Sequence, residues 1–179
     1  MATERDWVRI VAAERCDDCG FVASSVKRDE LSGGFRREAR LWSALLRGSP
    51  DASLRHRPGA QRWSALESGA HVRDVLAIFM ERIEMALVET NPEFGWWDHE
   101  AAVIDLRYNE QRPPAVADAI SSNAERLAVV ITALDDESWR RTGTRRMREH
   151  FTVEGLARFA LHESVHHRQD AEGATRQRP

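Results

Sequence analysis

The sequence predicts an all-α protein, a four-helix bundle preceded by a short N-terminal extension. Three observations lead to this prediction. Apolar residues recur at helical spacing in four long stretches of the 179-residue chain. No stretch alternates apolar and polar residues for long, so no strand is predicted. The composition, 42% hydrophobic and 31% charged, is that of a folded chain long enough to bury one full core.

The four helical patterns divide the chain into three parts. Residues 1–25 form the extension, residues 26–173 the bundle and residues 174–179 a short tail. The extension contains the sequence Cys16-Asp17-Asp18-Cys19. We expect a cytoplasmic protein, because the N-terminus carries acidic residues and lacks the apolar segment of a secretory signal. In that compartment the C-x-x-C spacing indicates metal or redox chemistry rather than a structural disulfide.

The first two helices differ in how clearly the sequence marks their starts. The first is expected at about 26–47, and Ser32-Gly33-Gly34 weakens its beginning because glycine is a poor helix former. The second follows Ser64, which forms with Glu67 the S-x-x-E pattern of a capping box. It ends before Asn91-Pro92. Its stripe at helical spacing consists of His71, Val75, Ile78, Phe79, Ile83 and Leu87.

The last two helices also begin at recognisable residues. The third helix is expected to follow Pro113-Pro114, with an apolar stripe that starts at Val116. Thr152 is a good N-cap for the fourth, which runs to Gly173. The connection 91–113 is unusually long for a compact domain. Its aromatic residues belong to a functional site or simply cover one open end of the bundle; they are Phe94, Trp96, Trp97 and Tyr108.

Four potential metal ligands lie within six residues of the fourth helix: His162, Glu163, His166 and His167. Residues four apart share a helix face, so His162 pairs with His166, and Glu163 with His167. His71 lies on the buried side of the second helix. A lone buried histidine is more often a core residue than a ligand. Facing helices that bring further imidazoles and a carboxylate, however, are how metal sites in bundles are built.

Helix geometry favours Glu163 and His167 as the pair that faces the core. Each residue turns about 100° around the helix axis. Glu163 and His167 therefore continue the apolar row of Leu156 and Ala160, whereas the other pair lies roughly a quarter turn away. We predict a metal site of His71, Glu163 and His167, with His162 and His166 as the alternative register.

Two segments of the chain resemble the DinB/YfiT-like superfamily. They are Trp63–Val75, which contains His71, and His162–Asp170; the W-R-R-T-G sequence from Trp139 also resembles the turn before the last helix of these proteins. The resemblance covers roughly residues 26–171. It implies a four-helix bundle with one metal ligand from the second helix and two from the fourth.

The last helix resembles two branches of this superfamily. Glu163, His167 and Asp170 reproduce the Glu-x3-His-x2-Asp pattern of mycothiol-dependent maleylpyruvate isomerases. Other members have the pattern His-Asp-x2-His-x2-Gln. This chain comes close to that pattern, with Glu in place of Asp, at His162, Glu163, His166 and Gln169. The first branch implies a low-molecular-weight thiol such as mycothiol as cosubstrate. The Cys16/Cys19 pair is not part of the superfamily's core pattern.

Two imidazoles and one carboxylate suit Zn2+, and Ni2+, Fe2+ or Mn2+ also accept such ligands. Three protein ligands leave a position open, as in catalytic sites. A thiol that enters this position loses its proton and becomes a strong nucleophile, whereas a water becomes hydroxide-like. The leading hypothesis is therefore a metal-dependent transferase or isomerase that uses a thiol and a small-molecule substrate. The alternatives are a metal-assisted hydrolase and a non-catalytic metal-binding bundle that acts in stress response or as a homodimer.

Two further patterns have two interpretations each. Cys16 and Cys19 either form a closed Cys2His2 site with the histidine pair that the first site leaves over, or make a plain turn at Gly20. The basic run after Trp139 is either a solvated face or a clamp for an anionic substrate. It consists of Arg140, Arg141, Arg145, Arg146 and Arg148.

The net charge and the lengths of the apolar runs argue against two classes of partner, nucleic acids and membranes. A net charge of -3 and a pI of about 6.2 argue against a nucleic-acid partner. No apolar run approaches the ~20 residues that would span a membrane.

Overall fold

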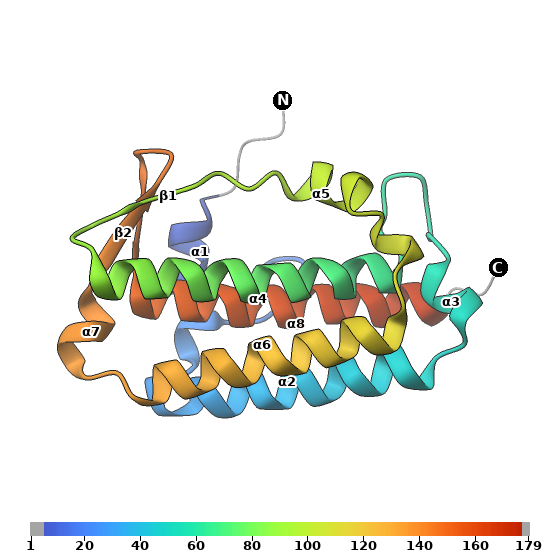
Figure 1. Cartoon of the computed structure of the whole chain (residues 1–179), viewed down its shortest axis with the longest axis horizontal. Helices are drawn as coiled ribbons and strands as arrows, with labels where there is room; N and C mark the ends of the chain where they lie inside the picture. The colour runs from blue at the N-terminus through green and yellow to red at the C-terminus, as the bar shows by residue number, and fades with distance from the viewer. Residues whose placement is uncertain (1–5, 177–179) are drawn as a thin grey trace.

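The computed structural model describes residues 6–176 and confirms the four-helix bundle (Figure 1). The four long helices are α2 (Arg28–Gly48), α4 (Ala65–Val88), α6 (Pro113–Thr132) and α8 (Val153–Arg176). Helix α4 packs along α8, α2 packs along α6, and a contact between α4 and α6 joins the two pairs. The pairing of α4 with α8 places the predicted ligands of both helices in one interface.

Shorter elements connect the long helices. The helical ones are α1 (Trp7–Ala13), the 3-10 turn η1 (Ala23–Ser25), α3 (Asp51–Arg55), α5 (His99–Asp105), the 3-10 turn η2 (Tyr108–Glu110) and α7 (Asp136–Arg140). Helix α1 belongs to the N-terminal segment and packs against α8. Helix α5 lies in the long connection between α4 and α6 and contacts α4.

The predicted helix starts are confirmed by their capping bonds. The Ser64 hydroxyl accepts from the Glu67 backbone N–H at 3.1 Å, and the Glu67 carboxylate accepts from the Ser64 N–H at 2.8 Å, so the capping box is complete. The Thr152 hydroxyl accepts from the Gly155 N–H at 3.0 Å. Helix α8 continues to Arg176, past its expected end at Gly173, because neither proline nor a left-handed turn interrupts it.

The prediction that the chain has no strand was wrong. A small sheet of three strands, in the order β1-β2-β3, consists of β1 (Glu93–Phe94), β2 (Thr142–Arg145) and β3 (Glu149–Thr152). Strands β1 and β2 are parallel, with Glu93 opposite Thr144, and β2 and β3 form an antiparallel hairpin. Strands of two and four residues are too short for an alternating pattern to be visible in the sequence.

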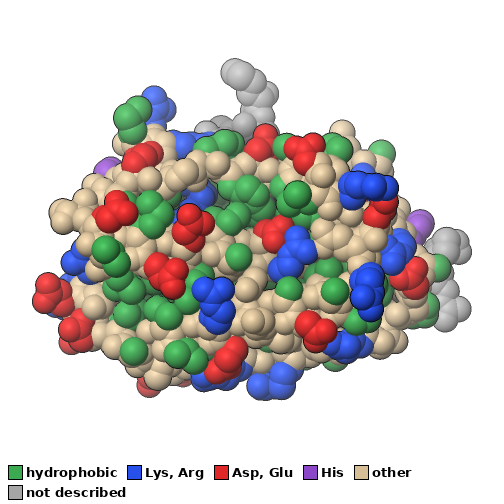
Figure 2. All heavy atoms as spheres, in the orientation of Figure 1, with side chains coloured by type: hydrophobic (Ala, Val, Ile, Leu, Met, Phe, Trp, Pro, Cys, Tyr) green, Lys and Arg blue, Asp and Glu red, His purple; other side chains and the backbone are tan. Residues whose placement is uncertain are grey.

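Within residues 6–176, no helix is long and apolar enough to cross a membrane. Figure 2 shows acidic and basic side chains interspersed over the face in view.

Two adjacent glycines in α2 have different surroundings. A Cβ added at Gly34 would lie 3.0 Å from Cδ2 of Leu161, whereas one added at Gly33 would meet nothing within 4 Å. Leu161 is fully buried. Gly34 therefore lets α2 approach α8 closely, and Gly33 has no such role. The helix passes through both glycines without a break, so the weakness expected from the sequence is overcome by packing.

We predict opposite effects of alanine at these two positions. Gly33→Ala should raise the free energy of unfolding by about 0.5–1 kcal/mol, because alanine is the better helix former. Gly34→Ala should be less stable than Gly33→Ala by about 1 kcal/mol or more, because Leu161 must move in a packed core. Urea unfolding of both variants measures the difference. Equal stabilisation by both would contradict the close α2–α8 packing.

Candidate metal centre

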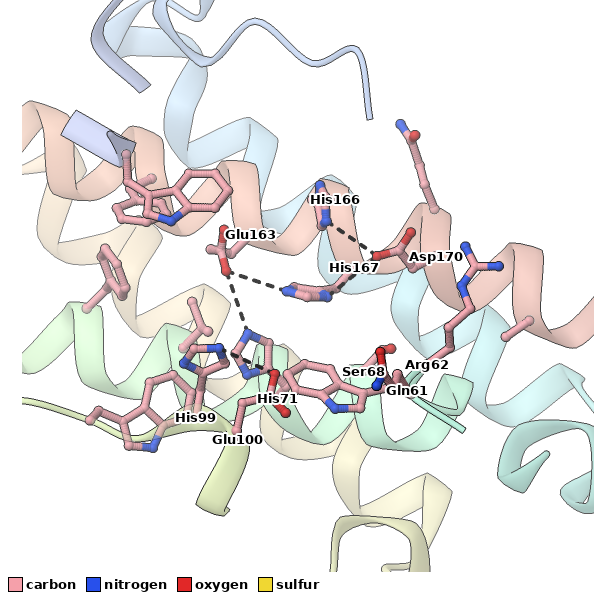
Figure 3. Close-up of a pocket in the computed structure, with 18 of the residues that line it drawn as sticks. Gln61, Arg62, Ser68, His71, His99, Glu100, Glu163, His166, His167 and Asp170 are labelled. Atoms are coloured by element: carbon pink, nitrogen blue, oxygen red, sulfur yellow. Dashed lines mark ion pairs between the residues drawn. The ribbon is translucent and has the colours of Figure 1, made fainter. Parts of the chain in front are cut away.

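His71 from α4 and Glu163 and His167 from α8 converge at one point (Figure 3). Glu163 Oε2 lies 3.6 Å from His71 Nε2 and 3.5 Å from His167 Nε2. The two imidazole rings meet edge to face, with centroids 4.5 Å apart. Glu163 and His167 lie one turn apart on the side of α8 that faces α4, as the apolar row of the sequence predicts. The structure thus brings together the three residues that the sequence selected.

The separations between these atoms fit a shared metal better than hydrogen bonds. Distances of 3.5 and 3.6 Å are long for a hydrogen bond between nitrogen and oxygen. Ligand bonds of ~2.1 Å at tetrahedral angles place nitrogen and oxygen ligands about 3.4 Å apart. Both ring nitrogens of His71 are buried without a hydrogen-bond partner, which is costly unless something else binds them. The donor set and its spacing therefore fit one divalent metal.

Burial and mutual charge set the protonation of these groups. Burial, together with the nearby His167, lowers the pKa of His71 to about 4. Burial alone would raise the pKa of the Glu163 carboxyl, but the imidazoles of His162, His167 and His71 hold it well below its usual value. At neutral pH, the site therefore offers a neutral His71 and an ionised Glu163. These are the protonation states that metal binding needs.

The cluster forms part of the wall of a cavity of about 740 Å3. Indole rings pack on both imidazoles: Trp97 stacks on His71 with centroids 5.2 Å apart, and Trp63 stacks on His167 at 5.5 Å. Trp97 comes from the long connection between α4 and α6. The sequence left open whether the aromatic residues of this connection belong to a functional site or cover other parts of the fold. Trp96 and Trp97 line the cavity, whereas the Phe94 ring covers Gly143 in the sheet.

Arginines line the part of the cavity formed by α4 and the hairpin. Arg145 pairs with Glu149 across the hairpin, and the Arg146 guanidinium lies over the Trp96 ring, 3.6 Å from its centroid. Arg82 is buried, and its burial and the charge of Arg145 lower its pKa to about 10. All three arginines line the cavity. Glu149 offsets the charge of Arg145. The positive charge that favours an anionic ligand group here therefore comes from Arg82 and Arg146.

The basic run of the sequence serves two purposes in the structure. Arg145 and Arg146 line the cavity, as the clamp interpretation requires. Arg141 instead donates to the backbone carbonyls of Ala86 and Glu89 and holds the end of α4 against the hairpin. Arg140 and Arg148 are exposed.

The alternative register points elsewhere. His162 and His166 face the N-terminal segment, where Cys16 and Cys19 lie next to them. His162 is fully buried, so it does not lie on an open flank of the helix. Asp170 is mostly exposed, and its Oδ2 lies 3.4 Å from His166 Nε2 and 3.9 Å from His167 Nδ1 (Figure 3).

Several residues of the cavity wall were not recognised from the sequence. Trp7, Arg82 and His99 are among them. Arg82 faces inward from α4 and is buried. In the sequence, a charged residue within an otherwise apolar stripe could have indicated this position. His99 packs near His71, with ring centroids 5.9 Å apart. It lies at the start of α5, outside the four long patterns, so no periodicity indicated its position.

Comparisons with known proteins agree with the fold. The family model described as the DinB superfamily matches residues 35–171. Among solved structures, YfiT from Bacillus subtilis is similar with a TM-score of 0.78 and 17% sequence identity, covering 86% of this chain and 89% of YfiT. That protein is described as a probable metal-dependent hydrolase with an unusual four-helix bundle topology. No curated protein matches the chain.

We predict that His71 and His167 bind the same metal ion. His71→Gln and His167→Gln should each lose about one equivalent of zinc relative to the wild type. The double variant should lose no more than either single variant, because one ion is removed in each case. Zinc content after dialysis against a weak chelator measures this. A double variant that loses twice as much would show that the two histidines bind different ions.

We also predict that His71 makes the free energy of unfolding of the metal-free protein depend on pH. Its pKa is about 4 in the fold and 6.5 in the reference state, so the unfolded chain binds more protons between these values. The free energy of unfolding should therefore fall as the pH falls from 6.5 to 4, by about 3 kcal/mol from His71 alone.

Parallel unfolding of the wild type and His71→Gln in chelator isolates this contribution. The wild type should lose about 3 kcal/mol more than the variant over this pH range, since glutamine does not titrate. Identical pH profiles would mean that His71 is not buried in its neutral form.

Proposed function

This chain belongs to the DinB superfamily, and we propose that it is a metal-dependent enzyme acting on a small anionic substrate with a low-molecular-weight thiol, such as mycothiol, as cosubstrate. The reaction class is transfer or isomerisation. One observation carries the proposal. The three-residue cluster of His71, Glu163 and His167 opens into a large cavity that also contains arginines.

The residues of the cluster have separable roles. His71 and His167 supply neutral nitrogens, and Glu163 supplies the negative charge that offsets part of the charge of a divalent cation. A divalent metal bound here lowers the pKa of a thiol or water in its remaining position and so supplies a nucleophile at neutral pH. Trp97 and Trp63 fix the imidazole planes by stacking and reduce the access of water to them.

The size and charge of the cavity support a thiol and a second substrate. A volume of about 740 Å3 lies in the upper range of small-molecule pockets, which span roughly 300–1,000 Å3. A cavity of this size has room for a thiol beside a second substrate. Arg146 lines the cavity and is placed to bind a carboxylate or phosphate. Arg145 is paired with Glu149. A metal held by the cluster would bind the reacting thiol.

A metal-dependent hydrolase is the second candidate. It is favoured by the likeness to YfiT, which is described as a probable metal-dependent hydrolase. The same cluster would then hold water in the position that the thiol takes in the first proposal. In a transfer the product contains the thiol, and in an isomerisation the thiol is required for turnover but is absent from the product. In a hydrolysis the product contains the elements of water and no thiol is required.

An activity screen of the zinc-loaded protein distinguishes the candidates. Small electrophiles with and without a carboxylate, including maleylpyruvate, are incubated with mycothiol, with glutathione or without thiol. We expect turnover only with a thiol and with the anionic substrates. His167→Gln should lower kcat/KM about 100-fold or more, because one of three ligands is lost. Turnover without thiol would favour the hydrolase, and no turnover under any condition would contradict both.

A second variant tests the arginines separately from the metal. Arg146→Gln should raise KM for anionic substrates about tenfold with little change in kcat, because one charge-assisted contact is lost. Arg47→Gln is the matched control, since Arg47 lies on α2 and pairs with Asp118 away from the cavity. Equal effects of both substitutions would rule out a specific clamp.

A further inference from the structure

A second cluster of metal-binding side chains lies about 100° around α8 from the first, on the face that meets the N-terminal segment. Its members are Cys16, Cys19, His162 and His166, and their ligand atoms all lie within 4.8 Å of one another. Cys16 Sγ is 3.8 Å from His166 Nδ1, and Cys19 Sγ is 3.6 Å from His162 Nε2. None of these four residues takes part in the proposed function.

These distances are close to those of a tetrahedral zinc site. With Zn–S bonds of ~2.3 Å and Zn–N bonds of ~2.0–2.1 Å, a sulfur and a nitrogen ligand lie about 3.6 Å apart. Two cysteines separated by two residues and two histidines separated by three have spacings that occur in structural zinc sites. Cys16 and His162 are buried, so their surroundings exclude most water.

The backbone of the N-terminal segment holds the two cysteines in a tight turn. The Cys16 N–H donates to the Phe21 carbonyl at 3.0 Å, and the Gly20 N–H donates to the Cys16 carbonyl at 2.8 Å. Gly20 has a φ of +72°, a conformation that favours glycine. The turn therefore fixes both sulfurs before any metal arrives, which lowers the entropic cost of binding.

The far nitrogen of each histidine meets a carboxylate. His162 Nδ1 lies 3.2 Å from Glu163 Oε1, and His166 Nε2 lies 3.4 Å from Asp170 Oδ2. Histidines that bind metals commonly donate their other ring N–H to a carboxylate, which fixes the tautomer and orients the ring. Each imidazole thus presents one nitrogen to the cysteines and the other to an acceptor.

We propose that Cys16, Cys19, His162 and His166 bind one Zn2+ ion in a closed structural site that fastens the N-terminal segment to α8. On binding, each thiol releases one proton to solvent, and the two thiolates and two neutral imidazoles complete the tetrahedron. Two thiolates neutralise the charge of Zn2+, so the filled site has no net charge, as its burial favours. This inference does not depend on the proposed function.

The site also affects the first cavity. Helix α1 of the same segment brings Trp7 against Phe159, with stacked rings 5.5 Å apart, and Trp7 lines the cavity. Zinc at the cysteines therefore holds one wall of the pocket that contains the first cluster. An ion in the second site would have no position open to substrate, because all four of its positions would be taken by protein ligands.

Adjacent histidines of α8 provide matched variants for the test. The full chain is purified under reducing conditions with zinc, and its zinc and free-thiol contents are measured. The wild type should contain about two equivalents of zinc. His166→Gln and Cys16→Ser should each contain about one, and so should His167→Gln, which removes the other ion. The double variant Cys16→Ser/His166→Gln should still contain one.

Cobalt substitution shows which ion each variant loses. Thiolate ligation gives a charge-transfer band in the near ultraviolet, which should be present in the wild type and His167→Gln and absent from Cys16→Ser. Hydrogen exchange of residues 6–26 should rise in Cys16→Ser and stay unchanged in His167→Gln. Circular dichroism confirms that each variant retains its helices.

The possible results separate this inference from the proposed function. One equivalent in the wild type that His71→Gln removes, with no thiolate band, would overturn the second site and leave the first intact. If the wild type contains one equivalent of zinc that Cys16→Ser removes and His71→Gln does not, the first site would be overturned and the second would stand. Loss of both free thiols with a mass decrease of two hydrogens would show a Cys16–Cys19 disulfide and would also overturn the zinc site.

Discussion

The arrangement of the molecule depends on how one helix divides its ligands between two faces. In α8, the pair His162/His166 and the pair Glu163/His167 have the same spacing and are offset by one residue, about 100° around the axis. Packing of α4 against one face brings His71 to Glu163 and His167. Packing of the N-terminal segment against the other brings two cysteines to the remaining histidines. The histidines of the two branch patterns found in the sequence therefore face different partners.

Glu163 links the two clusters. Its Oε2 faces His71 and His167, and its Oε1 lies 3.2 Å from His162 Nδ1. One carboxylate thus serves as a candidate ligand on one side and orients a candidate ligand on the other. Although burial opposes its ionisation, the surrounding imidazoles keep its pKa low. The N-terminal segment therefore meets the surroundings of the first cluster through His162 and through Trp7.

The sequence predicted the features that depend on periodicity and capping. Four helices, the Ser64 and Thr152 caps and the choice of Glu163 with His167 on α8 follow from spacing along single helices. The convergence of this pair with His71 also depends on the packing of α4 against α8, which the superfamily resemblance implied. The small sheet was missed because its strands are too short to show a pattern. His99 was missed because its inward-facing position depends on how the connection 91–113 folds back, and spacing carries no information about that path. Arg82 lies on α4 within the apolar stripe, but a single charged residue there was not recognised as part of a cavity wall.

Anomalous diffraction at the zinc absorption edge, from crystals of the zinc-loaded protein, tests the central claim most directly. The account predicts a peak within coordination distance of His71 Nε2, a Glu163 oxygen and His167 Nε2, with no fourth protein ligand. A peak at His162 and His166 alone, with none beside His71, would contradict it. In that case the face of α8 that meets α4 would be a packed polar core, and the cavity beside it would lack a metal centre.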